Sequence, residues 1–465
     1  MENFDTMLSQ RGQLLLIFEK YKFRKYRVLK TSEETVWRCT NKNCIATVYT
    51  LNSVFSRKEG THNHNLEEEL LVRQKVSNSL KRQAQEDISA KPAKLIRKEL
   101  NNQRDALETI SVTDFPYIRN NINRARLQLV PKLPRSAEEV QIFLNTANLK
   151  TSKEEPFLLC NNLSENIVVF SCKSNIEFMC QQDTLYMDGT FEFCTKFFGQ
   201  LFTIHALCNE VYVPVVFCLL KNKSKSTYLR LFNILKEKCD LMHCILNPKT
   251  IVIDFEMAVY LSVEEVWQGV QIIGCRFHLA QSWWRKIQQL GLASEYKNEQ
   301  SPIGTWLKHL FGLTFLPPAE VGDCFAEDFM CEKPENSKLD QFADYLVDNY
   351  IDSESKFPPE IWAENSCSIL RTTNTCESFH SKFKRENSSP YPNIHSFLKV
   401  LLEMQTDTYV KLNSIKRNEK KYIRRKILLK QKFIRSKIIQ LDRHEISRYN
   451  FVKCISYKFS SIANL

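Results

Sequence analysis

The spacing of apolar and polar residues changes along the chain, and each change marks a different kind of segment. Residues 11–64 contain short apolar runs separated by turns, which predicts strands. Residues 66–150 are polar, and their apolar residues fall at helical spacing. Three helices are predicted there, at 67–86, 92–101 and 116–127. We therefore predict a small all-β domain over residues 1–65 and a helical linker over residues 66–150.

Residues 151–390 alternate strand-like and helix-like segments, which is typical of an α/β fold. Three consecutive apolar runs predict strands at 185–194, 200–208 and 212–220. A helical pattern at 226–238 follows them. Short apolar runs at 250–255 and 270–273 predict two more strands. Three strands, a helix and a further strand are the topology of a ribonuclease-H-like mixed sheet, with a helical insertion predicted at about 291–365.

Composition and charge narrow the class of protein. The chain has 465 residues, 43% of them hydrophobic, which is ample for a large core and excludes a wholly disordered chain. Its longest apolar runs fall far short of a membrane span, and no signal peptide is visible. The net charge is +12, and residues 411–448 hold 14 Lys and Arg against three acids. We therefore expect a polyanionic partner, and neither a membrane nor a small-molecule substrate.

A cluster of cysteine and histidine residues closes the β domain. Cys39 and Cys44 are followed by His62 and His64, and two thiolates with two imidazoles complete a tetrahedral zinc shell. Residues two apart face the same side of a strand but diverge on a helix. The His-x-His spacing therefore predicts a β-type zinc module.

The strand before this cluster, residues 21–27, alternates aromatic and basic residues. Alternation predicts aromatic side chains on one face of the sheet and cations on the other. The cations are candidate DNA contacts, although a basic strand can also be a solvated face. They are Lys22, Arg24, Lys25 and Arg27.

Residues 11–64 resemble the FLYWCH zinc finger. The shared motifs are Gly-x-x-Leu from Gly12, Tyr-x-Phe at 21–23, Trp-x-Cys at 37–39, Cys44 and the closing His-x-His. The resemblance implies a zinc-dependent β-sheet that binds DNA.

Two acids stand at strand positions where a charge is costly unless it is paired, hydrogen-bonded or bound to metal. Asp188 lies inside an apolar strand, and Asp254 ends another. Metal-dependent phosphoryl chemistry needs carboxylates that hold two divalent ions about 4 Å apart. Either acid can also simply cap a strand or a helix.

Residues 160–390 resemble the transposase domain of Mutator-like elements. The motifs that carry the resemblance are 187–191, 253–258, 275–279 and 373–380, in that order. The resemblance implies a DDE-type transposase in which Asp188, Asp254 and Glu377 hold Mg²⁺ or Mn²⁺. Glu360 and Glu364 are rivals for the third acid. Glu256 is expected to begin the next helix instead.

Cys275 and His278 form a Cys-x-x-His pair, which can be half of a second zinc site. Cys376 with His380, or His309, are candidates for the other half. The alternative is a buried cysteine at a strand end and a histidine at a helix start. For three tryptophans of this region, Trp283, Trp284 and Trp306, a helix-core position is predicted.

Basic segments extend the expected DNA contact. The region 411–448 is predicted as a basic amphipathic helix that follows DNA phosphates, packs its apolar stripe on the core or carries a nuclear import signal. Its candidate DNA contacts are Lys420, Lys421, Arg424 and Arg425. A helix-turn-helix-like pair is considered at 91–101 and 116–126, with Arg119, Arg124 and Arg126 on the second helix; a helical spacer is the alternative.

The patterns, together with the two family resemblances, imply a nuclear DNA-binding transposase with structural Zn²⁺ and catalytic Mg²⁺ or Mn²⁺. The predicted fold is an α/β domain over 151–390 beside an all-β zinc domain, a helical linker and a basic helical region over 391–465. Enzymatic activity is favoured, on double-stranded DNA and as a homo-oligomer. The rival interpretation is a host-recruited, catalytically silent DNA-binding regulator that keeps the same fold.

Overall fold

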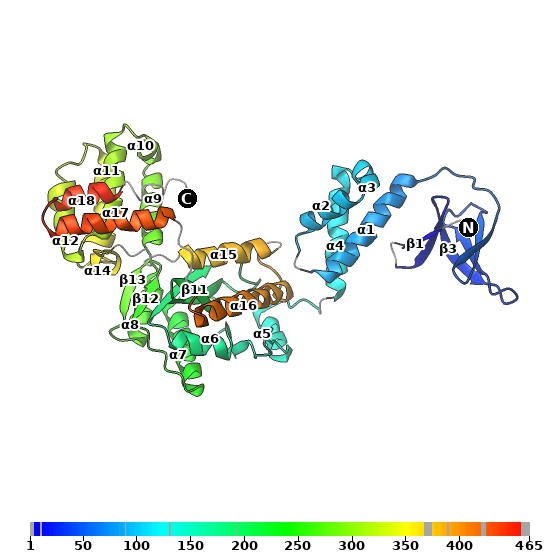
Figure 1. Ribbon diagram of the computed structural model, residues 1–465, viewed down its shortest axis with the longest axis horizontal. Coiled ribbons are helices and arrows are strands. Elements are labelled where there is room, and N and C mark those ends of the chain that lie inside the picture. Colours follow the sequence, from blue (N-terminus) through cyan, green and yellow to red (C-terminus); the bar gives the residue numbers. More distant parts are fainter. Residues whose placement is uncertain are drawn as a thin grey trace. The chain divides into compact units, whose positions relative to one another are not determined.

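The computed structural model describes residues 4–9, 12–88, 90–129, 132–191, 193–366, 374–387, 390–419 and 425–456, without the side chains of Asn374, Thr375 and Glu377. The chain forms two compact units, residues 1–133 with 386–388 and residues 134–385 with 389–465. Each unit is described by itself below (Figure 1).

The first unit opens with a six-stranded antiparallel sheet whose strands follow chain order. One face packs a small core that includes Leu16, Phe23, Trp37 and Val48. The strands are β1 (Asp5–Leu8), β2 (Leu14–Phe18), β3 (Tyr21–Val28), β4 (Thr35–Cys39), β5 (Thr47–Leu51) and β6 (Val54–Glu59). The predicted β domain is thus present. The sequence did not predict β1, which has only four residues and buries one of them, Met7.

Among the described residues of this unit, four α-helices follow the sheet, and three of them are the predicted ones. They are α1 (Glu68–Glu86), α2 (Pro92–Asn102), the short α3 (Arg104–Thr109) and α4 (Phe115–Leu129). Their core includes Val76, Leu80, Ile96 and Ile122. The first strand joins the bundle, because Gln74 and Asn78 of α1 donate hydrogen bonds of 2.8 and 2.6 Å to the carbonyl of Leu8.

The second unit contains a seven-stranded mixed sheet in the order β13-β12-β9-β10-β11-β8-β7. The central strands β9, β10 and β11 form an antiparallel meander, whereas β12 runs parallel to β9 and β13 parallel to β12. The strands are β7 (Leu158–Asn162), β8 (Ile167–Phe170), β9 (Thr184–Thr190), β10 (Gln200–Cys208), β11 (Val211–Leu220), β12 (Thr250–Ile253) and β13 (Gln271–Gly274). The five predicted strands are present, and β7 and β8 extend the sheet beyond them.

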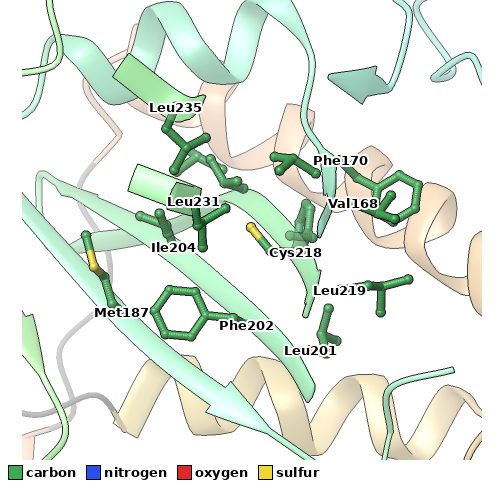
Figure 2. Close-up of a cluster of buried hydrophobic side chains, with 14 of the residues drawn as sticks. Val168, Phe170, Met187, Leu201, Phe202, Ile204, Cys218, Leu219, Leu231 and Leu235 are labelled. Atoms are coloured by element: carbon green, nitrogen blue, oxygen red, sulfur yellow. The ribbon is translucent and has the colours of Figure 1, made fainter. Parts of the chain in front are cut away.

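Several helices pack against this sheet. Figure 2 shows Leu231 and Leu235 of α7 grouped with Ile204 and Cys218 of the sheet in one apolar cluster. Helix α6 and helix α16 lie against β11. The helices of the part of the unit that contains the sheet are α5 (Ala137–Thr146), α6 (Lys173–Cys180), α7 (Lys225–Leu241), α8 (Met257–Val266), α15 (Asn374–Glu386) and α16 (Ile394–Lys416).

A second apolar core belongs to the helical insertion. It buries Trp283, Trp284 and Trp306, as predicted, and the C-terminal helices contribute Ile434 and Phe451 to it. Its helices are α9 (Arg276–Gln289), α10 (Ala293–Lys297), α11 (Pro302–Leu310), α12 (Pro318–Asp323), α13 (Ser337–Leu346), α14 (Pro359–Trp362), α17 (Arg425–Asp442) and α18 (Arg448–Ser456). The tighter 3-10 segment η2 (Phe311–Phe315) and the wider π segments η3 (Cys324–Phe329) and η4 (Val347–Ile351) link them.

The basic C-terminal region differs from the single helix that the sequence suggested. Helix α16 ends at Lys416, and a separate helix, α17, begins at Arg425. The apolar stripe of α17 packs Ile434 fully and Ile438 partly into the core of the insertion, while Leu428 and Leu429 stay exposed. No helix among the described residues is long and apolar enough to cross a membrane.

Candidate metal and nucleic-acid sites

The predicted zinc ligands come together at one end of the N-terminal sheet. Cys39 ends β4, Cys44 lies in the turn after it, and His62 and His64 follow β6. Their four ligand atoms all lie within 4.8 Å of one another. Sγ of Cys39 is 3.2 Å from Nε2 of His64, and Sγ of Cys44 is 3.3 Å from Nδ1 of His62. Two sulfurs and two nitrogens at these separations fit a tetrahedral Zn²⁺ shell.

The surrounding residues orient the imidazoles. The ring of Tyr21 stacks on His62 with centroids 3.4 Å apart. Nδ1 of His64 lies 3.1 Å from the carbonyl of Asn65, which leaves Nε2 free to bind metal. Burial, followed by the nearby His64, lowers the pKa of His62 and so favours the neutral form that binds metal. Burial also raises the pKa of the Cys39 thiol, so that metal binding must displace its proton.

The basic strand β3 obeys the predicted alternation only in its first half. Phe23 is buried and Arg24 exposed, but the pairing register with β4 shifts between Lys25 and Arg27. The shift is a β-bulge, which moves the following side chains to the opposite face. Tyr26 is two residues from Arg24, so alternation itself places it on the face of Arg24, and its ring centroid lies 3.6 Å from the guanidinium of Arg38. The prediction that the aromatic residues all face away from the cations is therefore wrong at Tyr26.

This face presents a set of cations that the sequence named only in part. Arg24 pairs across the strands with Arg38, Arg27 pairs with Val36 on the same face of β4, and Arg24, Tyr26 and Arg27 are exposed. Lys25 is also exposed, but it pairs with the core residue Trp37 and so lies on the opposite face. Lys22 is less available, since its Nζ lies 4.0 Å from a carboxylate oxygen of Glu67. Arg38 escaped the sequence analysis because a cross-strand neighbour is not visible in local spacing.

Of the two predicted acids of the large sheet, Asp188 lies on β9, and Asp254 directly follows the last residue of the parallel strand β12. Tyr186 of β9 pairs with Val252 of β12, so Asp188 and Asp254 stand at the next equivalent positions along the two strands. Asp188 is 4% exposed, and its carboxylate accepts a 2.8 Å hydrogen bond from the amide of Gly189. The parallel register of β9 and β12 therefore places the carboxylates of Asp188 and Asp254 at equivalent positions next to each other.

A histidine that the sequence analysis did not place in this site contacts the first acid. Nδ1 of His380, on α15, lies 3.3 Å from Oδ2 of Asp188. Nε2 of His380 lies 3.0 Å from the hydroxyl of Thr203, which is the cross-strand partner of Asp188. The hydroxyl of Thr203 is also 3.1 Å from Nε2 of the buried His205. These contacts hold Asp188 in one orientation.

The surroundings of the second acid, Asp254, disfavour its charged form. Burial raises the pKa of Asp254 to about 7; His278 opposes the shift, and the charges of Asp188 and Glu256 add to it. Glu256 itself is engaged, because it accepts a 2.9 Å hydrogen bond from the hydroxyl of Tyr228 and lies 3.6 Å from Nζ of Lys223. It directly precedes α8, as predicted.

The third predicted acid, Glu377, belongs to α15, one helical turn before His380. Its side chain lies outside the described residues, so its role stays a prediction. The rivals belong to the insertion: Glu360 is exposed on α14, and the amide of Glu364 donates a 3.3 Å hydrogen bond to the carbonyl of Thr314.

The Cys275/His278 pair stands at the start of α9. Cys275 is fully buried, and His278 influences Asp254. Within the described side chains, only the Cys39 cluster brings three or more metal-binding atoms together. Cys376 instead packs among apolar residues, and a second zinc site remains a prediction.

The remaining basic candidates separate into three groups. Lys420, Lys421 and Arg424 lie outside the described residues, whereas Arg425 is exposed at the start of α17. Arg119 and Arg124 are exposed on α4. Arg126 is buried, and its guanidinium donates hydrogen bonds to backbone carbonyls that include that of Asp87. The suggestion that Arg126 belongs to a DNA-reading helix face is therefore wrong.

Comparison with known families agrees with this geometry. A model described as the FLYWCH zinc finger domain matches residues 6–64, which contain all four zinc ligands. A model described as the MULE transposase domain matches residues 184–282, from β9 into α9. The chain carries a FLYWCH zinc finger and a MULE transposase domain. It is thus a transposase-derived zinc-finger protein of the DNA-binding class. No curated protein matches the chain.

The transposase match contains two of the three predicted acids, Asp188 and Asp254, as well as Cys275 and His278. Glu377 and His380 lie beyond it. Their link to the site comes instead from the contact between His380 and Asp188, which connects α15 with β9.

Proposed function

We propose that this protein is a DDE-type DNA transposase whose large sheet is ribonuclease-H-like. The observation that carries the proposal is the placement of Asp188 and Asp254 at one level of two adjacent parallel strands. The strand order β11-β10-β9-β12-β13 supports it, because an antiparallel meander followed by two parallel strands is the arrangement that the ribonuclease-H-like topology requires.

The donor set fits a hard divalent cation. Carboxylate oxygens are the ligands that Mg²⁺ and Mn²⁺ prefer. Asp188, Asp254 and Glu377 would hold such ions, whose chemistry is to activate the attacking oxygen and stabilise the leaving oxygen of a phosphodiester. A half-buried carboxylate whose pKa is raised, as at Asp254, is the state expected of a metal ligand without its metal.

Other residues of the protein would position the catalytic carboxylate and the DNA. His380 and the amide of Gly189 would hold the Asp188 carboxylate in position for a metal ion. The FLYWCH domain would bind DNA through the exposed cations of β3 and through Arg38, which stacks on Tyr26. Such a protein acts in the nucleus, and joining two DNA ends would require at least two copies.

Nicking and strand joining of supercoiled DNA in Mg²⁺ or Mn²⁺ test this function. Wild type is compared with Asp188→Asn and with Asp183→Asn, a matched control at an exposed acid paired with Lys249 just before β9. We expect cleavage by wild type and by the control, and none by Asp188→Asn. DNA binding without cleavage in either metal would overturn the enzyme and support the catalytically silent regulator.

A further inference from the structure

A large polar groove in the first unit has no part in the sites described above. It lies between the edge strand β1 and the helices α1 and α4, and its volume is about 1010 Å³. A pocket for a small ligand usually measures about 300–1,000 Å³ and is lined mainly by apolar side chains. This groove reaches the upper end of that range, but amides, hydroxyls and cations supply most of its lining. Its chemistry therefore suits an extended polar ligand.

The sequence places the polar residues of α1 and α4 on matching stripes. Lys75, Asn78, Arg82 and Gln85 recur every three or four residues along α1 and share one face of it. On α4 the residues that line the groove are again three or four apart, namely Asn121, Arg124 and Gln128. Helices α1 and α4 pack directly against each other, so the two stripes run side by side.

The charge of the groove is strongly positive. Four cations line it, against the single acid Asp5, which pairs with Lys75 at 3.1 Å. Lys81, Arg82 and Arg124 have no carboxylate within ion-pair distance in the part of the chain that the structure describes. Cations that stand together without acids attract a polyanion, and the neighbouring amide groups can donate to phosphate oxygens.

We propose that the groove between β1, α1 and α4 binds the phosphate backbone of double-stranded DNA, as a second contact beside the zinc finger. The inference rests on the proposed function only for the choice of DNA as the polyanion. It assigns the helices that follow the zinc finger a role in affinity that does not depend on base sequence.

The test compares two triple variants of the full chain that remove the same charge. K81Q/R82Q/R124Q neutralises the groove, and K94Q/R97Q/K98Q neutralises three exposed cations of α2 outside it. Binding of a fluorescein-labelled duplex of mixed sequence is followed by anisotropy at several salt concentrations. Each lost phosphate contact should lower the slope of log K against log salt by about 0.9.

We expect the groove variant to lose about tenfold or more in affinity and two to three units of salt slope, roughly one for each contact. The α2 variant should stay near wild type. Equal affinity and slope in the two variants would overturn the inference. Zinc content and circular dichroism identify a variant that has not folded. Cleavage is not measured in this experiment, so its failure leaves the proposed catalytic function standing.

Discussion

Asp254 shows how a proposed metal ligand can cost stability when no metal is bound. Burial raises its pKa to about 7 from an ordinary value of 3.8. A carboxyl whose pKa is raised by folding stabilises the fold while it is protonated. That contribution is fully present below about pH 4 and is lost as the pH rises through about 7. The metal-free protein is therefore expected to weaken over this range because of Asp254.

Asp254→Asn should remove this pH dependence, since asparagine resembles the protonated acid. Each pKa unit corresponds to about 1.4 kcal/mol, so we expect the metal-free variant to be more stable than wild type by about 2–4 kcal/mol near pH 8. The advantage should shrink toward pH 5. Thermal unfolding at the two pH values measures it, with Asp183→Asn as the exposed control. An advantage that does not change with pH would contradict the assignment.

For single residues, the sequence predicted a role correctly where the role follows from spacing along the chain. The zinc ligands Cys39 and His64 follow from spacing, because the metal requires a fixed number of donors. The contact of His380 with Asp188 could not be predicted, since it depends on how α15 packs against the sheet. Tyr26 was misplaced because the aromatic and basic residues of β3 do not alternate strictly: Tyr26 is two residues from Arg24 and so shares its face.

Elements of the chain were predicted best where one pattern runs through a whole segment. The central strands have continuous apolar runs, and β10 and β11 were found with nearly their observed bounds. The short β8 and the half-exposed β7 have no such run of sufficient length, and they were missed. Their existence depends on pairing with β11 and with each other, which only the tertiary structure supplies.

The zinc module is an element whose fold should depend on its metal. Cys39→Ser removes one of two thiolates, and we expect the protein to lose its zinc and the order of the N-terminal sheet. Cys331→Ser, at an exposed cysteine of the insertion, is the matched control and should keep its zinc. Elemental analysis and protease sensitivity of residues 4–64 report the two effects. Full zinc content in Cys39→Ser would exclude that ligand.

The docking of α18 on the insertion depends on a glycine in η2. A Cβ on Gly312 would stand 2.3 Å from the carbonyl oxygen of Val452, too close for any side chain. Gly312→Ala should therefore cost about 1–3 kcal/mol of unfolding free energy. Gly322, with no atom within 4 Å of its Cβ position in α12, is the control, and its alanine variant should be neutral or slightly stabilising. Equal effects in urea unfolding would contradict the close approach.

At the scale of the whole molecule, the FLYWCH and MULE segments were recognised from the sequence in their order along the chain, but the way distant segments share a core was not. The regular elements of the predicted insertion are all helices, joined by short turns. Its core, however, is completed by Phe451 and Ile455 near the end of the described chain. Helix α16 likewise packs against β11, from which it is distant in sequence. Such partners lie too far apart in sequence for periodicity to connect them.

The central claim is that the large sheet holds a divalent-metal site at Asp188 and Asp254. The most direct measurement is Mn²⁺ binding to the zinc-loaded protein, followed near pH 8 by the loss of the electron paramagnetic resonance signal of free Mn²⁺. We predict saturable binding by wild type and by Asp183→Asn, and its loss in Asp188→Asn. Binding by Asp188→Asn equal to that of wild type would contradict the account.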